Sequence, residues 1–203
     1  MMVIGVTGIL GSGKSTVTAL LKDRGFPVID LDALARDSLN WKETQSDIRE
    51  AFGEEYVRDG RVDVEKLREA AFKKGESLRI LESIVHPRIR QEVRKRLAAL
   101  EEGGAPMVFI DHPLLFETGF HRRFDRIVLV TAAMDTIRER LKERGMTAED
   151  VERRLSFQIP LEAKARKADY IIDNNGTEDR LEAEVDGLLE KITRWEVSQH
   201  VSQ

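Results

Sequence analysis

Eight residues near the amino terminus, Gly8-Ile9-Leu10-Gly11-Ser12-Gly13-Lys14-Ser15, have the types and spacing of a phosphate-binding loop. They fit the pattern G-x-x-x-x-G-K-[ST]. The glycines permit a tight turn in which successive backbone N–H groups point at anionic oxygens. Lys14 supplies a positive charge for the β- and γ-phosphates, and the Ser15 hydroxyl can ligate Mg²⁺. The pattern predicts nucleotide binding; the alternative is a flexible glycine turn with an incidental lysine.

The residues on either side of this loop support nucleotide binding. Val3–Thr7 is a short β-branched run of the kind found in buried parallel strands. After the loop, Val17, Leu20 and Leu21 recur at helical spacing. Strand, glycine-rich turn and helix thus follow one another in the order that a phosphate site requires.

Strand-like runs alternate with helical patterns along the whole chain, which predicts an α/β fold with a parallel sheet between helical layers. The expected strands are Val3–Thr7, Pro27–Asp30, Met107–Asp111, Arg126–Thr131 and Tyr170–Asp173. The expected helices are Lys14–Arg24, Leu31–Leu39, Val64–Lys74, Glu76–Glu101, Ala133–Arg144, Ala148–Gln158 and Glu178–Arg194.

Residues 1–203 are expected to form a single domain with two inserted segments. Residues from about 40 to 101 are mostly helical and long for a simple crossover, so we expect a substrate-side cap. Residues from about 144 to 167 are rich in arginine and glutamate, and we expect a lid over the site. The core then comprises about 1–39, 102–143 and 168–203.

Acidic residues follow two of the expected strands, where ligands bind in open parallel sheets. Asp30 ends the second strand and Asp32 follows two residues later, and either can orient a substrate hydroxyl and accept its proton. The alternative is a helix N-cap, because a helical pattern begins at Leu31. Asp111 ends the third strand and can hold a Mg²⁺-bound water.

Other candidate residues have structural alternatives. Leu114, Leu115 and Phe116 are either core, the commoner fate of apolar residues, or a wall of an acceptor pocket. His86 precedes Pro87 at an expected kink or break, so it is either a phosphate contact or a polar residue at that break. Basic residues gather in and around the expected lid: Arg138, Arg140, Arg144, Arg153, Arg154, Lys164, Arg166 and Lys167. Glutamates alternate with them, so most of the arginines are expected on the surface, and the alternative for one or two of them is contact with the nucleotide.

Composition limits the classes of function. The chain has 203 residues, a formal net charge of −4 and no cysteine, which argues against nucleic acid as the main partner and excludes disulfides and thiolate metal sites. No signal-peptide pattern and no stretch of membrane-spanning length is found, so we expect a cytoplasmic enzyme that does not bind membranes. We expect a monomer, and the sequence leaves an oligomer open.

An ordered series of short motifs resembles the dephospho-coenzyme A kinase family from Val3 to about Leu189. The series comprises Gly8–Ser15, Val28–Asp32, Phe52-Gly53, Asp59-Gly60, Asp63, Leu81–Pro87, Asp111–Glu117, Arg140, Arg144, Arg154-Leu155, Gln158, Ala168-Asp169 and Ile172–Gly176. The resemblance implies a P-loop kinase core, a helical acceptor domain and a lid. It also implies transfer of the γ-phosphoryl of ATP to the ribose 3′-hydroxyl of dephospho-coenzyme A, the last step of coenzyme A synthesis.

The resemblance also implies roles for individual residues. Asp32 is expected to engage the acceptor hydroxyl, with Lys14 and Arg140 as further catalytic residues. The ATP-binding residues are expected to be Leu10, Gly11, Ser12, Gly13, Lys14, Ser15, Thr16, Arg144, Arg154, Asn174 and Gly176. The acceptor is expected to contact Asp32, His86, Leu114, Leu115, Phe116 and Glu117. Ser15 and Asp111 are the expected Mg²⁺ ligands.

Three positions depart from the family pattern: Val64, His112 and Ile137. None of them lies in the phosphate loop or at Asp32. Another small-molecule kinase, or a nucleotide-binding module without catalysis, remains an alternative. A regulatory GTPase needs an N-K-x-D signature, which does not occur here.

Overall fold

The computed structural model describes residues 1–73 and 75–200, without the side chains of residues 71–75 and 196–200. The chain divides into two compact units. The first contains Met1–Val28 and the chain from Ala105 onward, and the second contains Ile29–Gly104. No helix within the described ranges is long and apolar enough to cross a membrane.

The first unit carries the main sheet. Its elements are β1 (Met2–Gly8), α1 (Lys14–Asp23), β5 (Met107–Asp111), η2 (Phe120–Arg123), β6 (Arg126–Thr131), α6 (Met134–Glu143), α7 (Ala148–Ser156), α8 (Leu161–Ala165), β7 (Tyr170–Asp173) and α9 (Glu178–His200). The second unit contains α2 (Leu31–Ser38), α3 (Lys42–Phe52), η1 (Glu54–Tyr56), β3 (Val57–Arg58), β4 (Arg61–Val62), α4 (Val64–Lys73) and α5 (Gly75–Glu102). Strand β2 (Val28–Asp30) spans the boundary.

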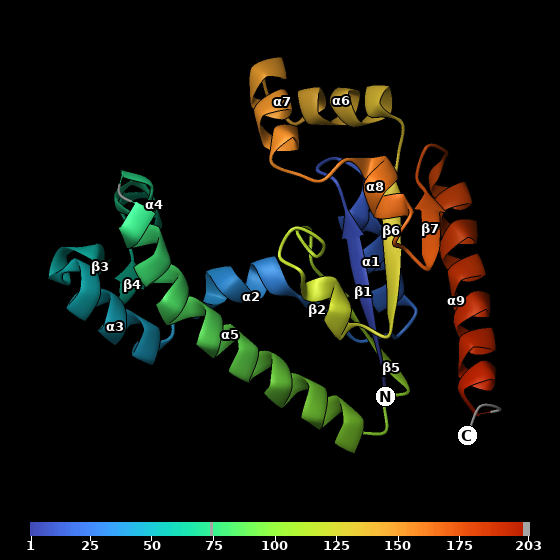
Figure 1. Ribbon diagram of the computed structural model, residues 1–203, viewed down its shortest axis with the longest axis horizontal. Helices are drawn as coiled ribbons and strands as arrows, with labels where there is room; N and C mark the ends of the chain where they lie inside the picture. The colour runs from blue at the N-terminus through green and yellow to red at the C-terminus, as the bar shows by residue number, and fades with distance from the viewer. Residues whose placement is uncertain (74, 201–203) are drawn as a thin grey trace. The chain divides into compact units, whose positions relative to one another are not determined.

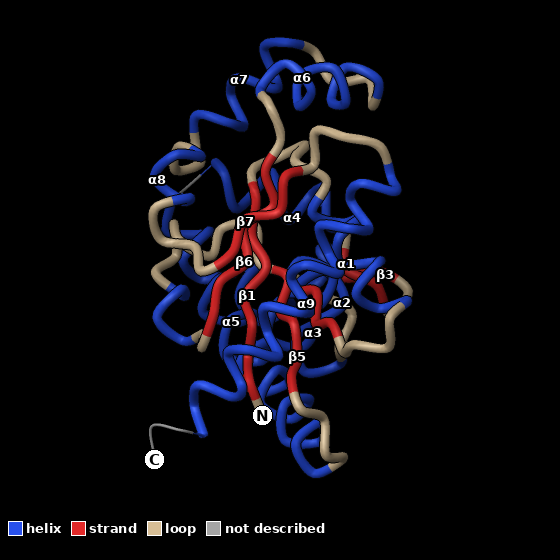
Figure 2. The backbone as a smooth tube through the Cα atoms, turned by 90° about the vertical axis from the view of Figure 1, so that its right-hand side faces the viewer, coloured by secondary structure: helices blue, strands red, loops and turns tan. Residues whose placement is uncertain are grey.

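The predicted five-stranded parallel sheet is confirmed, with the strand order β2-β5-β1-β6-β7. β1 lies at its centre, pairing in parallel with β5 and β6, and β7 pairs in parallel with β6 (Figure 2). At the outer edge, the Phe109 N–H donates to the Pro27 carbonyl over 2.9 Å. All five strands lie within two residues of their predicted limits, because runs of consecutive apolar residues are typical of strands buried on both faces.

The two faces of this sheet pack against different elements. Val128 and Val130 of β6 share a core cluster with residues of α1 and α9, and α9 runs beside β7 (Figure 1). Ile127, one residue out of phase, packs instead with Leu115 and Phe116 from the chain after β5. This alternation is the expected period of two for a strand covered on both sides.

The second unit has its own small core and contains two features that the sequence analysis missed. Its core is the cluster of Ile48, Val57, Val62 and Leu67. Helix α3 was not predicted, nor was the antiparallel hairpin of β3 and β4. Asp59-Gly60 forms the hairpin turn with positive φ at both residues, 49° and 71°. An Asp-Gly pair is a recognised hairpin signal, but the strands beside it are too short to show an alternating pattern in the sequence.

Of the kink or break expected at Pro87, the break is excluded, because α5 runs from Gly75 to Glu102 through the proline, close to the predicted helix Glu76–Glu101. Pro87 removes one N–H from the helical ladder, and both it and His86 are exposed, so water can reach this side of the helix. The Arg88 guanidinium bonds the Ile84 carbonyl at 2.8 Å and reaches Asp47 of α3 at 2.6 Å. These contacts support the helix around the proline. The predicted end of the preceding helix at Lys74 lies outside the described residues.

The sheet should depend strongly on Phe109 of β5, which is fully buried and meets Phe26 edge-to-face at 5.8 Å between ring centroids. We expect Phe109→Ala to lower the free energy of unfolding by about 3–5 kcal/mol, since it leaves a large cavity. Urea denaturation measures this. The matched control is Phe157→Ala, whose ring is 77% exposed and whose loss should cost about 0.5 kcal/mol or less. Equal losses in the two variants would contradict the packing described.

Candidate active site

The loop between β1 and α1 presents unpaired backbone donors. In the described part of the chain, the N–H groups of Gly11, Gly13, Lys14 and Ser15 have no hydrogen-bond partner. Helix α1 begins at Lys14, so the positive end of its dipole adds to these donors. Converging N–H groups at a helix N-terminus form an anion-binding site, which agrees with the predicted phosphate loop.

Two glycines of the loop adopt conformations that other residues disfavour. Gly11 has φ 82° and Gly13 has φ 88°. A Cβ atom at Gly13 would also lie 1.9 Å from the side-chain nitrogen of Asn174. At Gly11, a Cβ would meet Ile137 and Leu141 at 3.0 Å. Both backbone conformation and close packing therefore require glycine at these positions.

The loop is anchored to the elements around it. Ile9 and Leu10 pack into an apolar cluster with Ile137, Leu141 and Val151 of α6 and α7. The Leu10 N–H donates to the Gln158 side chain over 3.1 Å. Leu10 was predicted to bind ATP. Because its side chain packs in this cluster and its N–H is bonded to Gln158, it holds the loop in place.

The loop lysine is paired with the acid at the end of β5. Lys14 Nζ forms an ion pair with Asp111 Oδ1, and both side chains are largely buried. The residues predicted to bind phosphate and Mg²⁺ are thus brought into contact. Ser15 and Thr16 follow in the first turn of α1, and both are exposed.

The arginine predicted to be catalytic, Arg140, and the two predicted to bind ATP, Arg144 and Arg154, have different environments. Arg140 of α6 donates through Nη2 to the Asn174 carbonyl over 2.9 Å. Its Nη1 is buried and has no hydrogen-bond partner among the described residues. Arg144, which follows α6, and Arg154 of α7 are both exposed.

The two acids after β2 have different environments. Asp30 is the N-cap of α2, and its carboxylate accepts from the Ala33 N–H at 2.8 Å. Asp32 lies in the first turn of α2 and is exposed, and its carboxylate forms no hydrogen bond or ion pair within residues 1–73 and 75–200. The capping alternative therefore applies to Asp30, while Asp32 remains available for a ligand.

The run after β5 is split between core and surface. Leu115 and Phe116 are buried in the cluster that covers Ile127, as the core interpretation predicts. Leu114 is 41% exposed, so it is the residue of this apolar run that a ligand can touch. His86 is exposed on α5.

Glu117 has partners within the protein. Its Oε1 accepts from Lys164 Nζ at 2.7 Å and from the Ile159 N–H at 2.9 Å, and Lys164 is fully buried. Burial raises the pKa of the Glu117 carboxyl, but the hydrogen bond and charge of Lys164 and the Ile159 N–H outweigh this effect. The net pKa lies below its usual value, so Glu117 is a carboxylate at neutral pH.

The sequence profile of the Dephospho-CoA kinase family matches residues 2–179. A dephospho-CoA kinase of Corynebacterium glutamicum is 38% identical over 195 residues, which cover 95% of this chain and 98% of the relative. The crystal structure of TT1252 from Thermus thermophilus superposes with a TM-score of 0.81 at 38% identity, covering 94% of this chain and 97% of that one. The fold is also that of a dephospho-CoA kinase from Campylobacter jejuni, with a TM-score of 0.73, 24% identity and coverage of 96% and 98%.

This chain belongs to the dephospho-CoA kinase family. It is therefore an enzyme of the transferase class, a kinase of coenzyme A synthesis.

The structure explains one departure of this kinase from the family pattern. Ile137 is fully buried and packs beneath Gly11, so an apolar side chain suits the site. Val64 begins α4 and is 51% exposed. His112 bonds the Thr118 hydroxyl through Nε2 at 3.2 Å and meets Phe120 edge-to-face.

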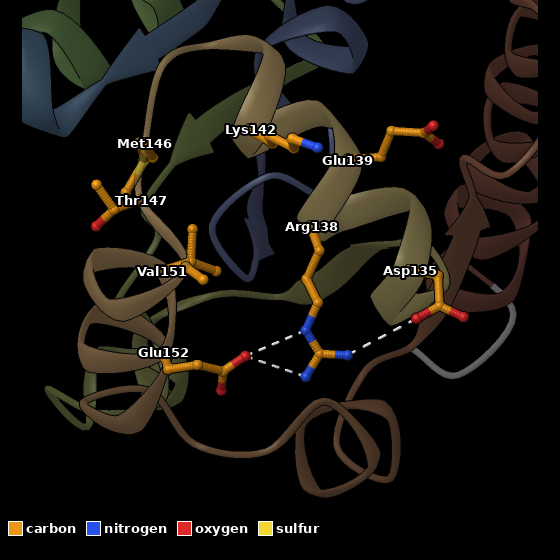
Figure 3. Close-up of a pocket in the computed structure, with 9 residues that line it drawn as sticks. Asp135, Arg138, Glu139, Lys142, Met146, Thr147, Val151 and Glu152 are labelled. Carbon is orange, nitrogen blue, oxygen red and sulfur yellow. Dashed lines mark hydrogen bonds and ion pairs between the residues drawn. The ribbon is translucent and has the colours of Figure 1, made fainter.

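A groove of about 720 Å³ lies between α6 and α7 of the kinase (Figure 3). Its walls carry Arg138, which bridges Glu152 at 3.1 Å and Asp135 at 3.7 Å. None of the predicted ATP-binding or acceptor residues lines it. Opposite charges on the walls of this groove thus partly neutralise one another.

Two residues near the site were not recognised from the sequence. Lys164 was grouped only with the basic residues around the expected lid, but it is fully buried against Glu117. A lysine within a mixed-charge stretch gives no signal of burial, because its partner lies 47 residues away. Gln158 appeared only as a family motif residue, and no sequence pattern indicated that it would bond the loop.

The Glu117–Lys164 pair should make stability depend on pH. Because the folded-state pKa of Glu117 is below its unfolded value of 4.5, the carboxylate contributes stability above pH 4.5 and loses it as the pH falls further. We expect Glu117→Gln to lower the free energy of unfolding at pH 7.5 by about 3 kcal/mol, since the buried Lys164 loses its opposite charge and keeps only neutral acceptors such as the Pro113 carbonyl. The difference from the wild type should shrink below pH 4.5. Urea denaturation over this range measures it.

The matched control is Glu162→Gln on α8, where the side chain is exposed. This variant should follow the wild type at every pH. A Glu117→Gln loss that is the same at acid and neutral pH would exclude the ionic contribution.

Proposed function

We propose that this kinase transfers the γ-phosphoryl of ATP directly to the ribose 3′-hydroxyl of dephospho-coenzyme A, giving coenzyme A and ADP. The observation that carries the proposal is the set of free N–H groups at Gly11, Gly13, Lys14 and Ser15, in a chain of this family. Transfer occurs in one in-line step, without a phosphorylated enzyme. The protein contributes positioning and charge stabilisation.

The nucleotide side of the reaction is assigned to the first unit. The free N–H groups bind the phosphate oxygens, and Lys14 leaves Asp111 to meet the β- and γ-phosphates. Arg140 carries the one buried guanidinium nitrogen of the site that lacks a partner within the described residues, so we assign Nη1 to the phosphates. Arg144, Arg154 and Gly176 complete the proposed ATP contacts.

The donor groups available for Mg²⁺ fit this ion. Mg²⁺ prefers oxygen ligands and keeps several waters, using one or two carboxylates together with substrate phosphates. Asp111 and the exposed Ser15 hydroxyl supply such oxygens, and no group of three or more His, Cys, Asp or Glu in the described ranges forms a self-sufficient metal site. Bound with ATP, the ion neutralises phosphate charge.

The acceptor contacts are assigned to Asp32, His86 and Leu114. Asp32 has a carboxylate free to accept a hydrogen bond from the 3′-hydroxyl and orient it toward the γ-phosphorus. His86, exposed on α5, and Leu114 are proposed as further acceptor contacts. Glu117 supports the site indirectly through Lys164 and Ile159.

The proposed roles of the larger segments follow from this assignment. Residues from about 40 to 101 form the acceptor domain, and residues from about 144 to 167 form a lid whose closure excludes water from ATP. We further propose that the kinase acts as a cytoplasmic monomer.

The decisive experiment measures ADP release from ATP and Mg²⁺ with and without dephospho-coenzyme A, and the mass of the product. We expect strong stimulation by the acceptor and a product heavier by one phosphate. Absence of stimulation in protein that binds ATP would reject the acceptor, and a panel of other nucleoside-like hydroxyl compounds would then be compared.

The role of Asp32 can be tested by Asp32→Asn. This change removes the charge that aligns the hydroxyl but keeps the size of the side chain. We expect turnover to fall by about 100-fold or more, with ATP affinity little changed. Steady-state kinetics and calorimetric titration with ATP measure the two effects.

Asp37→Asn is the matched control, because Asp37 is an exposed acid on the same helix. It should leave turnover unchanged. Near-normal turnover of Asp32→Asn would exclude Asp32 from the chemistry.

A further inference from the structure

Asn174 occupies a fixed position at the end of β7. Its backbone N–H donates to the Thr131 carbonyl over 2.8 Å, which continues the β6–β7 ladder by one residue. Its side chain is 6% exposed, so it has little surface to offer a nucleotide base. The expectation that Asn174 contacts ATP directly therefore leaves its buried amide unexplained.

That amide contacts the backbone of the phosphate loop. Asn174 Nδ2 lies 2.8 Å from the Ser12 carbonyl oxygen. Because a carbonyl can only accept, the NH₂ end of the amide must face it. The two residues are 162 positions apart in the chain, so the contact ties the last strand of the sheet to the first loop.

The contact determines the direction of one phosphate-binding donor. The Ser12 C=O and the Gly13 N–H belong to one planar trans peptide, so they point in opposite directions. When Asn174 holds the carbonyl, the Gly13 N–H must point away from Asn174, and it has no partner within the described part of the chain. Asn174 also packs directly against Gly13, where any Cβ would overlap its nitrogen.

Asn174 holds a second group of the site as well. Its backbone carbonyl accepts from Arg140 Nη2 over 2.9 Å. This bond uses one end of the guanidinium and leaves the buried Nη1 without a partner among the described residues. Loop peptide and arginine are thus held by the same residue.

We propose that Asn174 is a positioning residue that acts through the Ser12–Gly13 peptide to aim the Gly13 N–H at the nucleotide phosphates. Its role is to bind protein and not adenine. The inference rests on ATP binding at this loop, so the test measures binding directly, without acceptor.

The test compares two ligands that share phosphates but differ in the base. Calorimetry with Mg²⁺ measures the affinity of the wild type and of Asn174→Ala for ATP and for inorganic tripolyphosphate. We expect Asn174→Ala to weaken both ligands about tenfold or more and by the same factor, because a buried carbonyl loses its donor and the loop peptide is freed. In steady-state kinetics, KM for ATP should rise while KM for dephospho-coenzyme A stays the same.

Asn175→Ala is the matched control. Asn175 is also a side-chain amide, but it accepts from the Ala133 N–H and does not bond the loop. Its removal should leave the affinity for both ligands unchanged.

Three results would overturn the inference. Loss of ATP affinity with normal tripolyphosphate affinity would assign Asn174 to the adenine. Unchanged affinity for both ligands, or a fall in kcat alone with a lower melting temperature, would make the contact merely structural. If Asn174→Ala does not fold, the affinities of Asn174→Ser for ATP and tripolyphosphate are measured instead, and the same outcomes apply. A wild-type protein that binds neither ligand would instead reject the proposed function.

Discussion

A loop that binds an anion through its backbone must leave its own N–H groups unsatisfied. Backbone donors are normally paired, so such a loop tends to collapse onto any nearby acceptor unless the rest of it is restrained. Here the restraints come from outside the loop. Ile9 is buried in an apolar cluster against which Leu10 packs, Gln158 accepts from the Leu10 N–H, and Asn174 donates to the Ser12 carbonyl.

Other polar side chains of the molecule also differ in whether they are bonded within the protein or left available to a ligand. Asp30 and Asp32 are alike in sequence, but one is used to begin α2 and the other is left exposed. Glu117 and Lys164 neutralise each other beside the linker between α7 and α8. Asp30, Glu117 and Lys164 have partners within the protein and hold the structure, while Asp32, which has none within the described residues, is available to a ligand.

The sequence was a good guide to the sheet and to the loop, and a poorer guide to contacts between distant residues. The strands were predictable because both of their faces are buried, and the loop because its glycines and lysine have fixed spacing. The β3–β4 hairpin was missed because each of its strands has only two residues. The burial of Lys164 was not predicted, because it depends on a carboxylate that only the folded chain brings close. The different roles of Asp30 and Asp32 could not be predicted, because they depend on which carboxylate accepts a hydrogen bond from a helix N–H in the folded chain.

The close packing of Gly13 against Asn174 limits which substitutions these two positions can accept during evolution. Substituting Gly13 first introduces an atom 1.9 Å from the Asn174 nitrogen. Shortening Asn174 first removes the overlap but releases the Ser12 carbonyl, and a new side chain at position 13 must still adopt a φ of 88°. A substitution at one of the two positions therefore does not make substitution at the other acceptable. Gly13 and Asn174 are expected to be retained together while the surrounding sequence changes.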